Sequence, residues 1–134
     1  MSDVNQQIRI RCQANGAVTH RAALKVVGQV DGLLDVSVAT AATDKVIGFA
    51  LEAAADNAIF GVCIGGVCEA IATTTVTAGT HEFLTGAADG ELTPYAVGDR
   101  PVAYFVGCKK GSATAAANDV IDVLVIHAPI DTIV

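Results

Sequence analysis

The densest alternation of apolar and polar stretches lies within Val46–Ala70 and predicts short strands joined by a polar return. Gly65 and Gly66 stand in the middle of its second apolar run. Because glycine tolerates the positive φ of a tight turn, this pair predicts a hairpin that reverses the chain. The expected order is a strand at 46–51, a return at 52–57, a strand at 59–64, and a strand at 67–71 after the hairpin.

The same pattern of short apolar runs and turn signals continues along most of the chain. Residues 8–12 alternate apolar and basic, which in a strand puts Arg9 and Arg11 on one face and the apolar residues on the other. Asp31-Gly32 is a hairpin signal between two apolar runs. Further strands are expected at 24–30, 33–38, 91–95, 102–107 and 120–126, with 73–77 either a strand or an extended loop.

About nine or ten short strands separated by turn residues are typical of an all-β fold, a small β-sandwich or β-barrel. Helix-friendly runs are too short to be stable alone. We expect a flexible N-terminal arm with the first strand at 1–12, a single β-rich domain at 13–128 and a C-terminal tail at 129–134. The apolar end of the tail leaves two alternatives, docking on a neighbour or packing on its own domain.

Composition narrows the classes of partner. The 134 residues carry a net charge of -6 with only eight Lys and Arg, which argues against nucleic-acid binding, since phosphate affinity comes from basic charge. The polar N-terminus lacks the apolar core of a secretory signal. The longest apolar run, 59–68, is about half of a membrane span. We therefore expect a soluble protein that binds no membrane and no nucleic acid.

The sequence contains no catalytic signature. Four cysteines (Cys12, Cys63, Cys68 and Cys108) and three histidines (His20, His81 and His127) lack C-x-x-C or metal-ligand spacing. The cysteines are expected to be small buried hydrophobes, with one disulfide or a reactive thiol as the alternatives. No catalytic residue, cofactor or metal site is predicted, and we expect that the protein is not an enzyme.

The order of several short motifs resembles the small head-decoration, or capsid cement, proteins of tailed phages. The likeness covers roughly residues 26–126. The return carries Asp56-Asn57 where that family usually has a glycine, and asparagine also adopts the left-handed conformation. The motifs are the strand at 46–51, Gly66-Val67, the T-A-G turn at 77–79, the A-D-G turn at 88–90, Val97-Gly-Asp and the closing strand at 118–125.

The resemblance implies a structural protein on the outer surface of an assembled phage head, made in the host cytoplasm. It also implies a homotrimer that bridges copies of the major capsid protein and stabilises the capsid lattice against the pressure of packaged DNA. Such a role needs rigid shape and contact area summed over many copies. Our hypothesis is that the arm and tail make the capsid contact, and that the two arginines face acidic groups of the capsid. The predicted contact residues are Val4, Ile8, Arg9, Arg11, Ile130 and Ile133.

Two other classes of function compete with this interpretation. A carbohydrate- or receptor-binding β-module should display exposed aromatic residues, and this chain has no Trp and places Tyr95 beside a proline. A Cys-dependent hydrolase should have a thiol of lowered pKa in a cleft. The sequence favours the structural role over both.

Overall fold

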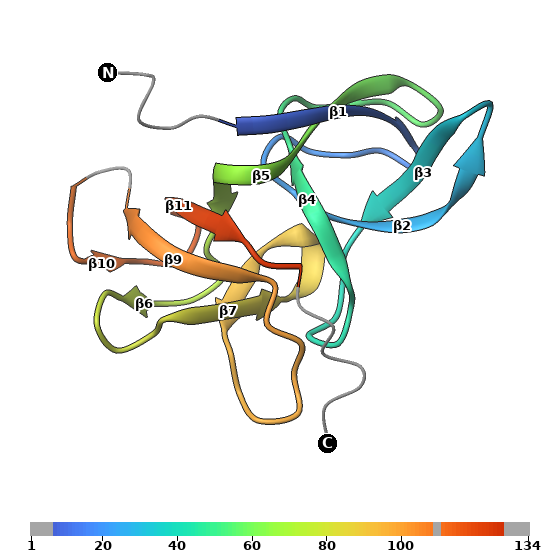
Figure 1. Cartoon of the computed structure of the whole chain (residues 1–134). Helices are drawn as coiled ribbons and strands as arrows, with labels where there is room; N and C mark the ends of the chain where they lie inside the picture. The colour runs from blue at the N-terminus through green and yellow to red at the C-terminus, as the bar shows by residue number, and fades with distance from the viewer. Residues whose placement is uncertain (1–6, 109–110, 128–134) are drawn as a thin grey trace.

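The computed structural model describes residues 7–108 and 111–127, and within these ranges it is built of strands, turns and one short 3-10 helix (Figure 1). This confirms the all-β prediction. The elements are β1 Gln7–Ala14, β2 Ala23–Val30, β3 Leu33–Val38, β4 Val46–Ala50, β5 Ile59–Ile71, β6 Val76–Thr77, β7 Phe83–Gly86, η2 Ala88–Gly90, β8 Leu92–Pro94, β9 Ala103–Cys108, β10 Thr114–Ala115 and β11 Val120–Val125.

Five strands pair in a closed ring in the order β1-β3-β2-β4-β5, with β5 pairing back to β1. All of these pairs are antiparallel except β1–β3. The β2–β3 hairpin turns at Asp31-Gly32 with φ of 52° and 83°, as its sequence predicted. Mostly small and branched side chains, together with Phe60, fill the ring, including Cys12, Ala14, Leu24, Val36 and Val62.

A second group of strands continues from β5 through β11, β9 and β7 to β8. It also returns to its start, because Leu92 of β8 forms a parallel bridge with Ala72, the residue after β5. Strands β6 and β10 form a separate two-stranded ribbon. Figure 1 shows the first ring in blue to green and the second in yellow to red, with β5 between them. The second core includes Phe49, Cys63, Cys68, Leu84, Val102, Phe105, Ile121 and Val123.

The hairpin predicted at Gly65-Gly66 is wrong, because β5 runs through both glycines from Ile59 to Ile71. Its two halves pair with different partners, β4 and β1 as far as Gly66 and β11 from Val67 onward. The strand nevertheless bends sharply, with Gly66 at φ +75°. Between Gly65 and Cys63 the register with β1 shifts by one residue, which marks a β-bulge. Glycines here allow one strand to leave one ring and enter the next.

The cysteines divide into a bonded pair and two free thiols. Cys63 and Cys68 form a disulfide across the bend, which is one of the alternatives that the sequence left open. Cys12 and Cys108 are free and buried, as expected for small hydrophobes. Asn57, in the return between β4 and β5, has φ +70°, so the asparagine does adopt the left-handed conformation.

Candidate functional site

Strand β1 presents a basic and apolar surface to solvent. Arg9 and Arg11 are both exposed and Cys12 is fully buried, as the alternation predicted. Ile8, which the alternation placed on the opposite, apolar face, is instead 61% exposed, next to the register shift between Ile8 and Arg9. It lies over Gly65, where an added Cβ would be 2.9 Å from Ile8 Cδ1. The bend in β5 therefore positions the exposed end of β1.

A groove of about 520 Å³ runs beside this strand and is lined by Arg9, Ile10, Arg11, Leu51, Glu52 and Gly61. Glu52 Oε2 accepts a hydrogen bond from the Gly61 N–H at 3.1 Å. Arg9 Nε donates to Gln7 Oε1 at 3.1 Å. Within the described ranges neither Arg9 nor Arg11 forms an ion pair with a carboxylate. Their positive charge is therefore available to a partner.

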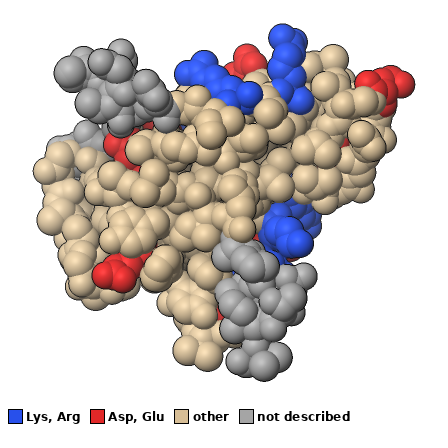
Figure 2. All heavy atoms as spheres, in the orientation of Figure 1, with Lys and Arg blue, Asp and Glu red and all other residues tan. Residues whose placement is uncertain are grey.

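The basic residues fall into paired and unpaired groups. Of the six Lys and Arg in residues 7–108 and 111–127, Arg21 pairs with Glu69 at 2.8 Å and Lys25 with Asp44 at 3.5 Å. Two of the other four line the β1 groove, and the remaining two, Lys45 and Arg100, line a separate pocket. Figure 2 shows basic side chains along the upper edge, where β1 runs in Figure 1, above a wide face with few charges.

An apolar row crosses the exposed face of the second group of strands. Tyr104 of β9 is in register with both Phe83 of β7 and Leu124 of β11. These side chains are about two-fifths exposed, and Val106, further along β9, is exposed too. The rings of Phe83 and Tyr104 meet edge to face with centroids 5.6 Å apart. Strand pairing thus assembles an apolar surface from residues about 20 positions apart in sequence.

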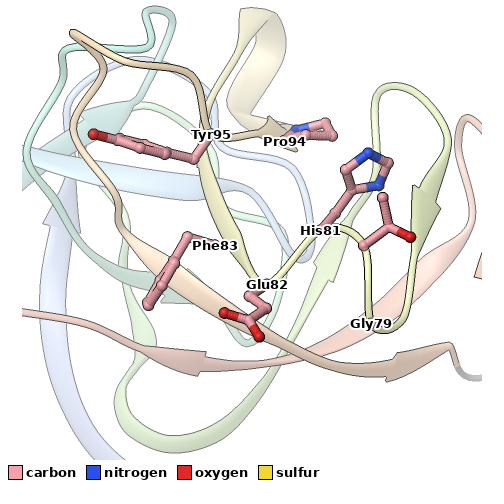
Figure 3. A pocket seen from close by; sticks show the side chains of 7 residues that line it. Gly79, His81, Glu82, Phe83, Pro94 and Tyr95 are labelled. Carbon is pink, nitrogen blue, oxygen red and sulfur yellow. The ribbon is translucent and has the colours of Figure 1, made fainter.

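A pocket of about 240 Å³ adjoins this row at the edge of β7 (Figure 3). Phe83 and Tyr95 lie on one side of it and His81 on the other, with Glu82 at the rim. The Tyr95 N–H donates to the Phe83 carbonyl at 3.0 Å, which holds the two residues together. The Thr77 N–H donates to His81 Nδ1 at 3.0 Å and fixes the ring. All three exposed aromatic residues of the chain, Phe83, Tyr95 and Tyr104, therefore gather in one region.

Within the described residues, no hydrogen bond joins a cysteine thiol to a histidine ring. Cys63 and Cys68 are bonded to each other, and burial raises the pKa of the Cys12 thiol, which disfavours a reactive thiolate. His127 Nε2 lies 2.7 Å from the Ile64 carbonyl oxygen. Among the described residues no group of three or more His, Cys, Asp or Glu is placed to hold a metal ion. A search of the same residues finds no helix long and apolar enough to span a membrane.

The residues predicted to contact a capsid are only partly described. The structure brings Ile8, Arg9 and Arg11 together on one exposed strand. Val4, Ile130 and Ile133 lie outside the described residues, so their role stays a prediction. Sequence reasoning missed the aromatic pocket and the apolar row, because no local pattern relates residues 83, 95, 104 and 124.

No protein-family model matches the chain, and no curated protein sequence matches it. Among solved structures, it is similar to the crystal structure of head fiber gp8.5 N base in bacteriophage phi29. The TM-score is 0.68 at 17% identity, and the match covers 92% of this chain and 97% of that chain. At this identity the likeness shows a shared fold. A phage head protein thus shares the fold of this chain along nearly its whole length.

Proposed function

We propose that this protein is a structural virion protein that binds the outer surface of an assembled phage head and stabilises the capsid lattice. The observation that carries the proposal is the fold, which it shares with the base of a phage head fiber over nearly all of both chains. The order of turn and strand motifs that resembles capsid cement proteins points the same way. Its partner is then the major capsid protein, and it is made in the host cytoplasm before it joins the virion.

The surface of β1 supplies the contact in this proposal. Arg9 and Arg11 carry charge that no described carboxylate neutralises, and the exposed Ile8 adds apolar area on the same strand. A charged rim around an apolar contact is the usual anatomy of a protein interface. Because each head carries many copies, a modest affinity per copy sums to a large stabilisation of the lattice. The net charge of -6 limits attraction to DNA nearby.

Co-sedimentation with purified heads of the phage that encodes the chain tests the contact. We expect the wild-type protein to sediment with expanded heads and the R9Q/R11Q variant to bind at least tenfold more weakly, with a loss that grows smaller at high salt. A K25Q/K45Q variant removes the same charge from elsewhere on the molecule and should bind like the wild type. Equal weakening by both variants would point to net charge rather than to β1.

A ligand- or receptor-binding role is the second candidate, and the pocket at Phe83 and Tyr95 is the observation that favours it. Exposed aromatic rings beside hydrogen-bonding groups suit a sugar, whose C–H face packs on a ring while its hydroxyls bond polar side chains. If this role holds, soluble oligosaccharides change the tyrosine fluorescence of the protein in a saturable way, and Y95A abolishes the change. A hydrolase is disfavoured, because all four cysteines are either disulfide-bonded or buried.

A further inference from the structure

Lys45 and Arg100, which form no ion pair within residues 7–108 and 111–127, line a pocket where β4 begins and β11 ends. Its volume is about 210 Å³. Lys45, Arg100 and His127 contribute the basic groups, and the remaining lining is apolar and comes chiefly from Ile47, Val102 and Ile126. A pocket with basic groups beside an apolar floor suits a segment that carries one carboxylate next to apolar side chains.

Arg100 lies in the loop between β8 and β9 and is held in place by the loop between β3 and β4. Its backbone N–H donates to the Ala42 carbonyl at 2.9 Å, and its Nε donates to the Thr43 carbonyl at 3.3 Å. The buried hydroxyl of Thr85 lies 2.6 Å from the Ala42 carbonyl oxygen and 2.7 Å from that of Arg100, so it ties the two loops together. The guanidinium is therefore positioned by the fold rather than free in solvent.

One nitrogen of this guanidinium has no acceptor among the described residues. Nη1 of Arg100 is buried, and no group in residues 7–108 and 111–127 accepts a hydrogen bond from it. Burying a charged donor without an acceptor is costly, and a carboxylate is the acceptor that best fits a guanidinium. Neither Arg100 nor Lys45 pairs with a carboxylate in the part of the chain that the structure describes. The described lining of the pocket thus contains basic groups but no carboxylate to pair with them.

The sequence that follows His127 carries such a group. Residues 128–134 read APIDTIV, with a single acidic side chain, Asp131, between Ile130 and Ile133. His127 is the last described residue and itself lines the pocket. Four residues of extended chain span up to about 13 Å, which is enough to bring Asp131 to cations that line the same pocket as His127.

We propose that residues 128–134 fold back into this pocket of their own chain, with the Asp131 carboxylate on Arg100 and Lys45 and the isoleucines on the apolar floor. The tether gives the segment a millimolar effective concentration at the pocket, so a weak contact suffices. The inference goes beyond the capsid role and does not depend on it. For Ile130 and Ile133 it replaces the capsid contact expected from the sequence with a contact inside the protein.

A peptide added in trans tests the pocket directly. The protein truncated after His127 is titrated with the heptapeptide APIDTIV and followed by ¹H–¹⁵N NMR. We expect saturable shifts at the amides of Ile47, Arg100 and Val102, and several-fold weaker binding of the peptide with Asp131→Asn. Absence of shifts at these amides, or equal binding of both peptides, would overturn the proposal.

A thermodynamic cycle in the full chain tests the pairing of Asp131 with Arg100. D131N should lower the melting temperature by about 3 °C in the wild-type background and leave it unchanged in the R100Q background. D31N, which alters an exposed turn carboxylate, should change neither. The effect must be independent of protein concentration. A D131N effect that appears only where sedimentation shows association would place the tail on a second copy and overturn the own-chain assignment.

Discussion

Cys63 and Cys68 are joined by a disulfide although they belong to the same strand, and their Cα atoms lie 6.2 Å apart. Five residues of straight strand would separate them by roughly 16 Å. Cys63 pairs with β4 and β1 of the first ring, whereas Cys68 lies opposite Val123 in the second. The bond therefore fixes the bend at which β5 passes from one ring to the other.

Thiol titration and reduction test this bond. In denaturant without reductant, the protein should show two reactive thiols, those of Cys12 and Cys108, and not four. Reduction should lower the free energy of unfolding by about 2 kcal/mol, the loop-closure entropy of so short a loop. The C63A/C68A variant should lose the sensitivity to reductant. Four thiols in the unreduced protein would refute the pairing.

Gly48 tests the close contact between β4 and β5. A Cβ at this position would collide with the carbonyl oxygen of Cys63, a backbone atom that cannot rotate away. Gly48→Ala should therefore cost about 2 kcal/mol or more in urea denaturation. A Cβ added to Gly107 of β9 would meet nothing within 4 Å, so Gly107→Ala should change stability by less than about 1 kcal/mol. Equal effects of the two substitutions would contradict the packing.

Asp44 should give the protein an acid-sensitive contribution to stability. Burial alone raises the pKa of Asp44, but hydrogen bonds from the Thr40 and Ala41 N–H groups and the charge of Lys25 outweigh it and lower the pKa. Because the folded-state pKa is below the unfolded one, the stabilisation is present above about pH 4 and is lost as the pH falls through the folded-state value.

The Asp44→Asn variant measures that contribution. It should be less stable than the wild type by about 1 to 2 kcal/mol at pH 7, and the difference should shrink in acid, near pH 3 and below. Asp31→Asn, at the exposed β2–β3 turn, should change the free energy of unfolding by less than about 0.5 kcal/mol. A stability difference for Asp44→Asn that is constant from pH 7 to acid would refute the assignment.

We propose that the protein forms the homotrimer that its resemblance to capsid cement proteins implies, and that the apolar row on β7, β9 and β11 is the surface buried in it. Sedimentation velocity should show a trimer for the wild type and a monomer for the Y104K/L124K variant, since burying a lysine without a partner is costly. V26K/V27K places the same charge on two exposed apolar residues of β2, in the other ring, and should remain trimeric. A wild-type protein that is monomeric at every concentration would contradict this use of the row.

Local signals predicted most strands, because each depends on a short apolar pattern bounded by turn residues. Residues 33–38 were predicted with the observed bounds, and Asp31-Gly32 turns as expected. The hairpin at Gly65-Gly66 failed because a glycine pair serves a bulged bend as well as a turn. Only long-range pairing distinguishes these cases, since β11 rather than the first half of β5 lies beside residues 67–71.

The candidate sites were predictable only where a single strand carries them. Arg9 and Arg11 lie two residues apart, so the period of a strand was enough to place both on the outside. Phe83 and Tyr104 meet because β7 pairs with β9, and Tyr95 joins them because it follows β8, which also pairs with β7. Lys45 and Arg100 line one pocket although they are far apart in the sequence. Neither cluster could be predicted from the spacing of its residues along the sequence.

The most direct test of the virion role is a quantitative protein count on purified particles of the phage that encodes this chain. We expect the protein to be present in a fixed ratio to the major capsid protein, and heads stripped of it with mild denaturant to rupture more readily. Absence of the protein from intact particles would contradict the virion role.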